Sequence, residues 1–240
     1  MTIHSYQRAV VTGAASGIGA ACVQMLRNRD VEVTAIDRDA ARLDALAAAT
    51  GCRPLVLDLR DTNMLRDRLE EIETDILINN AGLAHDLEAG FLGAEPVHMD
   101  EMIDVNITAV LHATHATLKG MAQRQRGHIV TIGSIAGLYT LGLPVYTATK
   151  GALHAFARSL RTELTGTCVR HTEICPGRTE TGFFASAFPD DAARERFKSA
   201  QGLLSPDDIA AAIAFALESP LSMNVSLIEL TPTDQAPGER

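Results

Sequence analysis

Long hydrophobic runs are missing from this 240-residue sequence. The longest uninterrupted apolar run, residues 209–217, has nine residues, whereas a membrane-spanning helix needs about 20. Residues 1–8 also lack the apolar stretch of a secretory signal. We therefore expect a cytoplasmic protein that has no membrane partner.

Cysteine is scarce as well. The four cysteines, Cys22, Cys52, Cys168 and Cys175, show no C-x-x-C spacing of the kind that binds zinc. We interpret them as reduced thiols of a cytoplasmic protein and predict no metal site.

Positive charge is in deficit. Lys and Arg total 21 against 30 Asp and Glu, which gives a net charge of −9. The long-range field therefore has the wrong sign for nucleic acid or anionic lipid. A small molecule is the expected partner.

The residues that are present predict one α/β domain over 1–240, because 46% are apolar and 21% charged. Strands and helices alternate along the chain. Strands are expected at 8–12, 31–37, 52–58, 75–79, 127–133, 169–175 and 225–230, and helices at 17–28, 40–49, 62–72, 100–124, 145–165 and from Pro206 after a Ser205 cap. Helical crossovers predict a doubly wound, mostly parallel sheet with helices on both faces. Residues 182–202 fit this rhythm poorly, and we interpret them as an insertion that covers the substrate.

A glycine-rich loop, residues 12–19, lies between the first strand and the first helix. Glycines allow a backbone to turn sharply beside a pyrophosphate, and a helix N-terminus attracts its charge. An ordinary glycine-rich turn is the alternative. The residues predicted to bind the dinucleotide here are Gly13, Ser16, Gly17, Ile18 and Gly19.

Asp37 closes the second strand, 18 residues after Gly19, near the offset of a ribose-binding acid. Its carboxylate would repel a 2′-phosphate, which favours NAD over NADP. Arg38 could pair with that phosphate, but strand alternation predicts that it points to the other side, and Ser16 is not basic. A simple helix cap is the alternative role for Asp37.

Tyr146 and Lys150 are four residues apart in a predicted helix, so they lie on one face about one turn apart. Ser134 follows the strand at 127–133, at an edge where open parallel sheets bind ligands. We expect the ammonium of Lys150 to lower the pKa of Tyr146 toward the range useful for proton transfer. A chance Y-x-x-x-K and a solvated lysine are the alternatives.

Taken together, these motifs resemble the single-domain branch of the short-chain dehydrogenase/reductase family over residues 12–230. The resemblance implies a Rossmann-type fold and a homotetramer or homodimer. The motifs that carry it are T-G-x-x-x-G-x-G at 12–19, N-N-A-G at 79–82, Asn106, Ser134, Y-T-A-T-K at 146–150 and P-G-R-T-E-T at 176–181.

The resemblance also implies roles for four catalytic residues. Tyr146 would exchange the substrate's hydroxyl proton while hydride passes to or from the nicotinamide, and Ser134 would hold the same substrate oxygen. Lys150 would lower the tyrosine pKa and bind the nicotinamide ribose, and Asn106 would hold a water linked to Lys150. Asn106 could also relieve a helix kink. Further cofactor contacts are implied at Asp58, Leu59, Asn80, Ala81, Gly82, Pro176, Gly177, Thr179 and Thr181.

For the substrate, residues 227–235 are similar to the ending of dehydrogenases of 3-hydroxy acids and serine-like amino acids. Asp37 departs from those relatives, which commonly carry basic residues there and use NADP. Arg178 could clamp a carboxylate or sulfonate, or be a surface arginine beside Glu180. His85 could line the substrate pocket, or cap a helix.

Three functions remain open. The first is an NAD-dependent dehydrogenase of a small secondary alcohol or hydroxy acid. The second is a ketoacyl-thioester reductase, for which only Arg124 and Arg126 offer a basic docking patch for an acidic carrier. The third is a non-catalytic nucleotide sensor.

Overall fold

A single parallel sheet organises the chain. The computed structural model describes residues 6–85, 87, 89–183, 202–236 and 238. The seven strands are paired in parallel throughout, in the order β3-β2-β1-β4-β5-β6-β7. They are β1 (Arg8–Thr12), β2 (Glu32–Asp37), β3 (Arg53–Val56), β4 (Ile76–Asn79), β5 (Gly127–Ile132), β6 (Val169–Pro176) and β7 (Leu227–Leu230). The predicted doubly wound α/β fold is confirmed.

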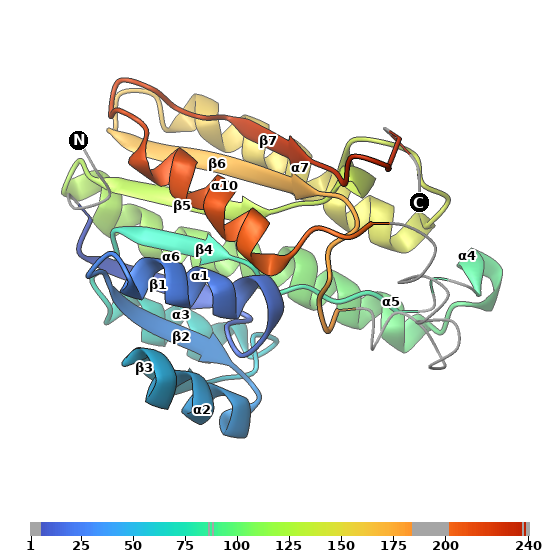
Figure 1. Cartoon of the computed structure of the whole chain (residues 1–240), viewed down its shortest axis with the longest axis horizontal. Coiled ribbons are helices and arrows are strands. Elements are labelled where there is room, and N and C mark those ends of the chain that lie inside the picture. Colours follow the sequence, from blue (N-terminus) through green and yellow to red (C-terminus); the bar gives the residue numbers. More distant parts are fainter. Residues whose placement is uncertain (1–5, 86, 88, 184–201, 237, 239–240) are drawn as a thin grey trace.

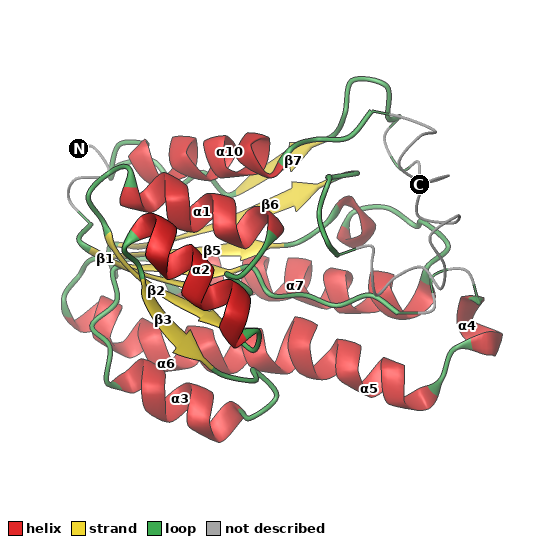
Figure 2. Ribbon diagram, turned by 60° about the horizontal axis from the view of Figure 1, so that its bottom comes forward, coloured by secondary structure: helices red, strands yellow, loops and turns green. Residues whose placement is uncertain are grey.

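Helices cover both faces of the sheet (Figures 1 and 2). Strand β1 shows why: Ala9 and Val11 pack into one hydrophobic core, while Val10 between them packs into the other. Helices α1 (Gly17–Arg27), α2 (Ala40–Thr50) and α10 (Pro206–Glu218) cover the first core. Helices α3 (Thr62–Glu70), α6 (Ala109–Gln123) and α7 (Pro144–Glu163) cover the second.

The long helix predicted over 100–124 is interrupted. It is made of α5 (Pro96–Ile103), a π-helical turn η2 (Asp104–Thr108) and α6. Two short elements were not predicted: α4 (Gly90–Gly93) and the 3₁₀ turn η3 (Ile135–Gly137). Periodicity cannot reveal an element of three or four residues, nor one extra residue inside a helix.

The cap predicted at Ser205 is confirmed, with Pro206 in the first turn of α10. Ser205 Oγ accepts a hydrogen bond from the amide of Asp208 at 3.2 Å, and Asp208 Oδ2 accepts one from the amide of Ser205 at 2.8 Å. This reciprocal capping box satisfies two amides at the start of α10.

The sheet changes winding direction between β1 and β4, which are neighbours although β2 and β3 separate them in sequence. Ligands of open α/β sheets bind in the crevice at such a switch point. Helices α4 and α5 project from this end of the molecule (Figure 2). Of the predicted insertion, only Gly182, Phe183 and Gly202 belong to the described residues, so most of it lies outside them. No helix in the described ranges has both the length and the apolar character for a membrane crossing.

Candidate active site

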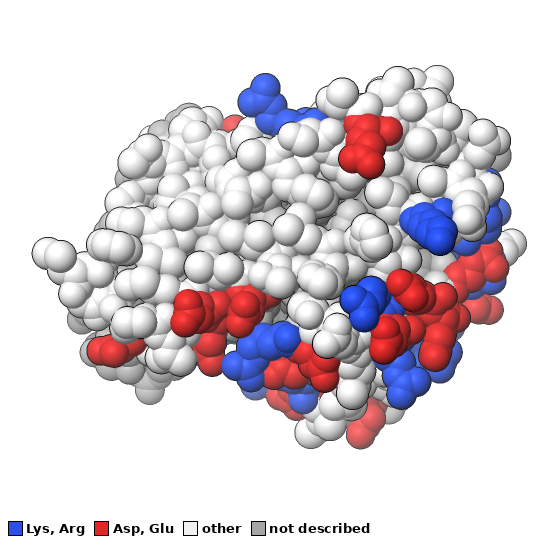
Figure 3. Space-filling view, turned by 180° about the vertical axis from the view of Figure 1, so that it is seen from behind, with Lys and Arg blue, Asp and Glu red and all other residues white. Residues whose placement is uncertain are grey.

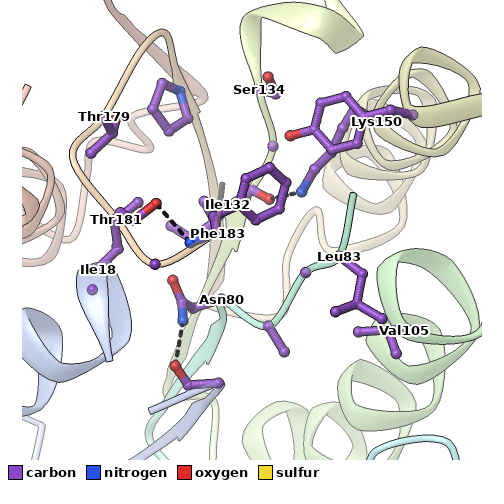
Figure 4. Close-up of a pocket in the computed structure, with 18 of the residues that line it drawn as sticks. Ile18, Asn80, Leu83, Val105, Ile132, Ser134, Lys150, Thr179, Thr181 and Phe183 are labelled. Carbon is purple, nitrogen blue, oxygen red and sulfur yellow. Dashed lines mark hydrogen bonds between the residues drawn. The ribbon is translucent and has the colours of Figure 1, made fainter. Parts of the chain in front are cut away.

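A cavity of about 580 Å³ lies at the carboxyl ends of the central strands (Figure 4). It joins the glycine loop to the predicted catalytic side chains. The predicted residues that line it are Gly13, Ser16, Gly17, Ile18, Asp37, Asp58, Leu59, Asn80, Ala81, Gly82, Ser134, Tyr146, Lys150, Pro176, Gly177, Arg178, Thr179 and Thr181. Gly19, Asn106 and His85 are absent from this lining.

The glycine loop is packed closely against the segment that follows β4. Gly13 has a φ of +62°, and a Cβ there would lie 2.7 Å from the Cα of Ala81. Asn80 Nδ2 donates hydrogen bonds to the carbonyls of Thr12 at 3.0 Å and Gly13 at 2.9 Å. A Cβ on Gly19 would collide with the carbonyl of Gly13. Gly19 therefore lets the first turn of α1 lie against the loop, and it does not itself line the cavity.

The N-terminus of α1 opens onto the cavity. Ser16 stands at the N-cap in an extended conformation, but its side chain makes no capping hydrogen bond. The first-turn amides therefore have no side-chain acceptor there, and the positive end of the helix dipole faces the lining residues Gly17 and Ile18. This arrangement fits the pyrophosphate of a dinucleotide.

Asp37 is held rigidly beside the loop. Its Oδ2 accepts a hydrogen bond from the amide of Ala15 and its Oδ1 one from the amide of Asp39, both at 3.0 Å. Asp39, not Asp37, caps α2 by accepting from the amide of Arg42. The alternative role of Asp37 as a helix cap is therefore wrong.

Arg38 also lines the cavity. The prediction that strand alternation turns it away is wrong, because Arg38 lies one residue beyond the end of β2. The acidic and the basic side chain thus border the same part of the site.

Asp58 and Leu59 line the cavity after β3. The Arg60 guanidinium donates to both carboxylate oxygens of Asp58, at 2.7 to 3.1 Å. These bonds hold the pKa of Asp58 below its usual range. The carboxylate therefore stays charged near neutral pH.

Three predicted catalytic side chains converge at the ends of β5 and α7. Lys150 is 3% exposed, and its Nζ donates to the carbonyl oxygen of Ile132 at 2.9 Å and lies 5.9 Å from the centroid of the Tyr146 ring. Ser134 Oγ accepts a hydrogen bond from the amide of Ala136 at 3.1 Å. Figure 4 shows Ser134 and Lys150 on the opposite side of the pocket from Ile18 and Thr179.

The protonation properties of this group differ from the expectation. Burial raises the pKa of Tyr146 to about 12, and the neighbouring Ser134 hydroxyl opposes the rise. Burial lowers the pKa of Lys150 to about 8. The predicted lowering of the tyrosine pKa by Lys150 is not found, because burial of the phenol dominates and Lys150 is not among the groups that shift this pKa.

Asn106 lies in the π turn and is fully buried. Its Oδ1 accepts from the amide of Leu83 at 2.7 Å, and its Nδ2 donates to the Leu83 carbonyl at 2.9 Å and to Thr149 Oγ1 at 3.1 Å. A Cβ on Gly82 would lie 3.5 Å from Asn106 Oδ1 and 3.7 Å from Lys150 Nζ. Asn106 thus clamps the segment after β4 directly behind the cavity, and the π turn places it there.

Arg178, which is 5% exposed, also borders the cavity. Phe183 tilts against the Tyr146 ring with 5.7 Å between centroids. Gln235, which the sequence did not indicate as a site residue, also lines the cavity, and its Oε1 accepts from the amide of Arg178 at 3.0 Å. No local pattern marks Gln235, because it reaches the site from 57 residues farther along the chain.

His85 lies outside the main cavity. Its Nε2 is 3.3 Å from Glu101 Oε2, and its ring stacks on His98 with centroids 4.5 Å apart. It lines a small neighbouring hollow that shares Leu87, Leu143 and Tyr146 with the main cavity. A substrate contact of His85 stays a prediction.

Comparison with known proteins agrees with this geometry. The sequence pattern of the short chain dehydrogenases matches residues 7–192. With the parallel sheet and the shared cavity, this match shows that the chain belongs to the short-chain dehydrogenase/reductase family of oxidoreductases.

Individual relatives cover nearly the whole chain. A short-chain type dehydrogenase/reductase of Sinorhizobium fredii, y4eK, is 37% identical over 98% of this chain and 95% of its own length. The NADP-dependent 3-hydroxy acid dehydrogenase YdfG of Escherichia coli K12 is 34% identical over 95% of each. The closed form of a serine dehydrogenase complexed with NADP+ superposes with a TM-score of 0.91, at 32% identity over 96% of each chain.

Proposed function

We propose that this protein is an NAD(H)-dependent dehydrogenase that interconverts a small hydroxy acid and its carbonyl compound. The observation that carries the proposal is one cavity that joins the glycine loop and the open end of α1 to Ser134, Tyr146 and Lys150. The residues that would hold the cofactor are those of the loop, Asp37 and the segment Asn80 to Gly82. When bound, the nicotinamide takes up or supplies the hydride.

The proton of the reaction is assigned to Tyr146. Its phenol is protonated at neutral pH, since its pKa is about 12, so it can donate a proton to a carbonyl oxygen in the reducing direction. Ser134 would donate a hydrogen bond to the same oxygen and orient it. Lys150, charged at neutral pH with a pKa of about 8, would bind the nicotinamide ribose.

Asp37 supports NAD over NADP. Two backbone amides fix its carboxylate at the cavity wall, where it would repel a 2′-phosphate that carries almost two negative charges. Use of NADP is the second candidate, and one observation favours it: Arg38 borders the same wall. The names of the 3-hydroxy acid dehydrogenase and serine dehydrogenase relatives both specify NADP.

Arg178 supports a substrate that carries a carboxylate. A buried guanidinium at the wall of a low-dielectric cavity favours an anion and can bind it through two parallel hydrogen bonds. The relatives named for 3-hydroxy acid and serine dehydrogenation act on substrates of this chemical class. A neutral secondary alcohol remains the less favoured substrate.

Arg124 and Arg126, the basic patch considered for a ketoacyl-thioester reductase, lie away from the cavity. Arg126 donates to buried Asp75 at 2.9 and 3.1 Å, and Arg124 donates to the Thr74 carbonyl and pairs with Glu73. These partners precede β4, so both arginines lie at the amino-terminal edge of the sheet, opposite the cavity. On the face drawn in Figure 3, acidic and basic side chains are intermixed.

The oligomeric state and the cellular location of the protein are part of the proposal. We propose a single domain that forms a homotetramer or homodimer in the cytoplasm. Ala152, Phe156 and Leu160 are apolar and near helical spacing in α7; Leu160 is buried and Phe156 packs against the same core, and only Ala152 of the three is exposed.

The test is steady-state absorbance at the nicotinamide band with purified protein. Matched pairs of 2- or 3-hydroxy acids and their neutral alcohol analogues are compared, each with NAD and with NADP. We expect turnover of at least one hydroxy acid, and faster turnover with NAD. Cofactor binding without turnover of any alcohol or acid would favour the nucleotide sensor.

A further inference from the structure

The carboxylate of Glu173 is buried close to the end of β5 that anchors Lys150. Glu173 lies in β6, between β5 and β7, and is 0% exposed. Its Oε2 is 2.8 Å from Nδ1 of His154, which reaches it from α7 with 24% of its side chain exposed. Its Oε1 has no nitrogen or oxygen hydrogen-bond partner within the described part of the chain, and the Cys175 thiol hydrogen-bonds to the carboxylate. A buried carboxylate with so few partners is costly to stability, so its presence calls for a reason.

The position of Oε1 supplies that reason. A Cβ on Gly133 would lie 2.7 Å from Glu173 Oε1 and 3.1 Å from Cys175 Sγ. Glycine at this position therefore makes room for the carboxylate. Gly133 directly follows Ile132, whose carbonyl oxygen accepts the hydrogen bond from Lys150. Glu173 thus approaches the peptide that anchors the ammonium.

Three ionisable groups stand out around Lys150 among the described residues. Cys175 and Glu173 of β6 act on its charge, and the Tyr146 ring lies 5.9 Å from its Nζ. Burial raises the pKa of the Cys175 thiol, and Glu173 adds to the rise, so the thiol stays neutral. Glu229 of β7 is exposed and accepts a hydrogen bond from Tyr139. Among these groups, the Glu173 carboxylate is the one suited to carry negative charge toward Lys150.

Electrostatics supports the same link. Burial lowers the pKa of Lys150 to about 8, and Cys175 and Glu173 act in the opposite direction. A lysine with no nearby anion would lose its charge more readily at this depth. Glu173 of β6 therefore helps to keep Lys150 positively charged.

We propose that Glu173 is a positioning residue that acts through Lys150, as the buried counter-charge of its ammonium, and that His154 holds the carboxylate in place from the surface side. The inference rests on the proposed catalytic role of Lys150. It names two residues that contact neither substrate nor cofactor but keep the lysine charged over the working pH range.

The lysine charge can be measured directly, because the chain has only three lysines, Lys119, Lys150 and Lys198. The full-length protein is labelled with lysine carrying carbon-13 at Cε, and the signals are followed by NMR against pH. Lys150 is assigned by its loss in Lys150→Met. We expect Glu173→Gln to lower the titration midpoint of Lys150 by about one pH unit. Glu163→Gln, the same change at an exposed position of α7, should leave it unmoved.

An unchanged or raised midpoint in Glu173→Gln would overturn the inference. Should that variant fail to fold, Glu173→Leu with His154→Leu replaces both partners by apolar side chains, which proteins often tolerate. We expect the same lowered titration midpoint of Lys150 in this double variant, and an unchanged midpoint would likewise overturn the inference. Glu173→Asp retains the negative charge, so its Lys150 midpoint should return most of the way to the native value.

Turnover gives an independent second readout. The alkaline limb of the pH profile of kcat should move to lower pH in Glu173→Gln, whereas a purely structural role would lower kcat without moving the limb. The NMR midpoint needs no cofactor or substrate. A shifted midpoint in a protein without turnover would therefore contradict the proposed function alone, and turnover with an unshifted midpoint would contradict only the role of Glu173.

Discussion

The ammonium of Lys150 donates a hydrogen bond of 2.9 Å to the backbone carbonyl of Ile132, the last residue of β5. This bond fixes a positive charge at the carboxyl end of a central strand, two residues before Ser134. The pKa of the lysine is lowered to about 8 by burial, so the side chain is mostly charged at neutral pH. The site proposed for proton transfer by Tyr146 therefore also holds a fixed positive charge.

Asp37→Ala should weaken the preference for NAD. Removing the carboxylate relieves its repulsion of a 2′-phosphate, and a change of about 1.4 kcal/mol would alter the ratio of the two kcat/KM values about tenfold. The measurement is the ratio of kcat/KM with NAD to that with NADP. Asp39→Ala, which removes the cap of α2 and an exposed ion pair with Arg42, should leave the ratio unchanged. A native protein that already prefers NADP would contradict the role given to Asp37.

Arg178→Gln should impair the use of hydroxy acids selectively. Loss of a charge-assisted hydrogen bond to a carboxylate costs about 1.5 to 3 kcal/mol, or roughly tenfold to a hundredfold in kcat/KM. The neutral alcohol analogue should be affected little. Arg161→Gln, which removes a hydrogen bond to the Ser226 carbonyl away from the cavity, serves as the matched control. Equal losses for acid and alcohol would mean that Arg178 supports the fold and does not bind the substrate.

Acid should destabilise the protein through His171. Burial lowers the pKa of this histidine to about 3, and its Nε2 lies 3.0 Å from Thr131 Oγ1. The unfolded chain takes up a proton below about pH 6.5 while the folded chain does not, so stability falls as pH drops from about 6.5 toward 3, by up to about 1.4 kcal/mol per pH unit.

The free energy of unfolding in urea, measured from about pH 6.5 to pH 5, tests this. His171→Gln should remove about 1.4 kcal/mol per pH unit from the slope. Buried His128, whose pKa is also lowered mainly by burial, contributes equally in both proteins. His115→Gln, at an exposed position of α6, should keep the native slope. Identical slopes in His171→Gln and the native protein would contradict the assignment.

The sequence predicted those features that depend on local spacing. Buried strands stand out as short apolar runs, and Tyr146 and Lys150 lie one helical turn apart whatever surrounds them. The position of Asp37 at the end of the second strand, beside the glycine loop, follows from the strand–loop–helix order. These features require only neighbours in sequence or adjacent strands.

Features set by distant contacts could not be predicted. Gln235 enters the cavity because the C-terminal segment folds back onto the turn at Arg178. Glu173 reads as an ordinary polar residue in a strand until α7 places His154 against it. Gly19 fits the cofactor motif, and the structure shows in addition that it lets α1 lie against the carbonyl of Gly13 and the side chain of Asn80.

Tyr146→Phe tests the central claim most directly. The substitution removes one oxygen from a phenol assigned to proton transfer, a contribution of about 10²- to 10⁴-fold. With the best hydroxy acid and its preferred cofactor, we expect kcat to fall by about this factor while the cofactor Kd changes little. Tyr139→Phe, which loses only a hydrogen bond to exposed Glu229, should retain native turnover. Native turnover in Tyr146→Phe would contradict the account.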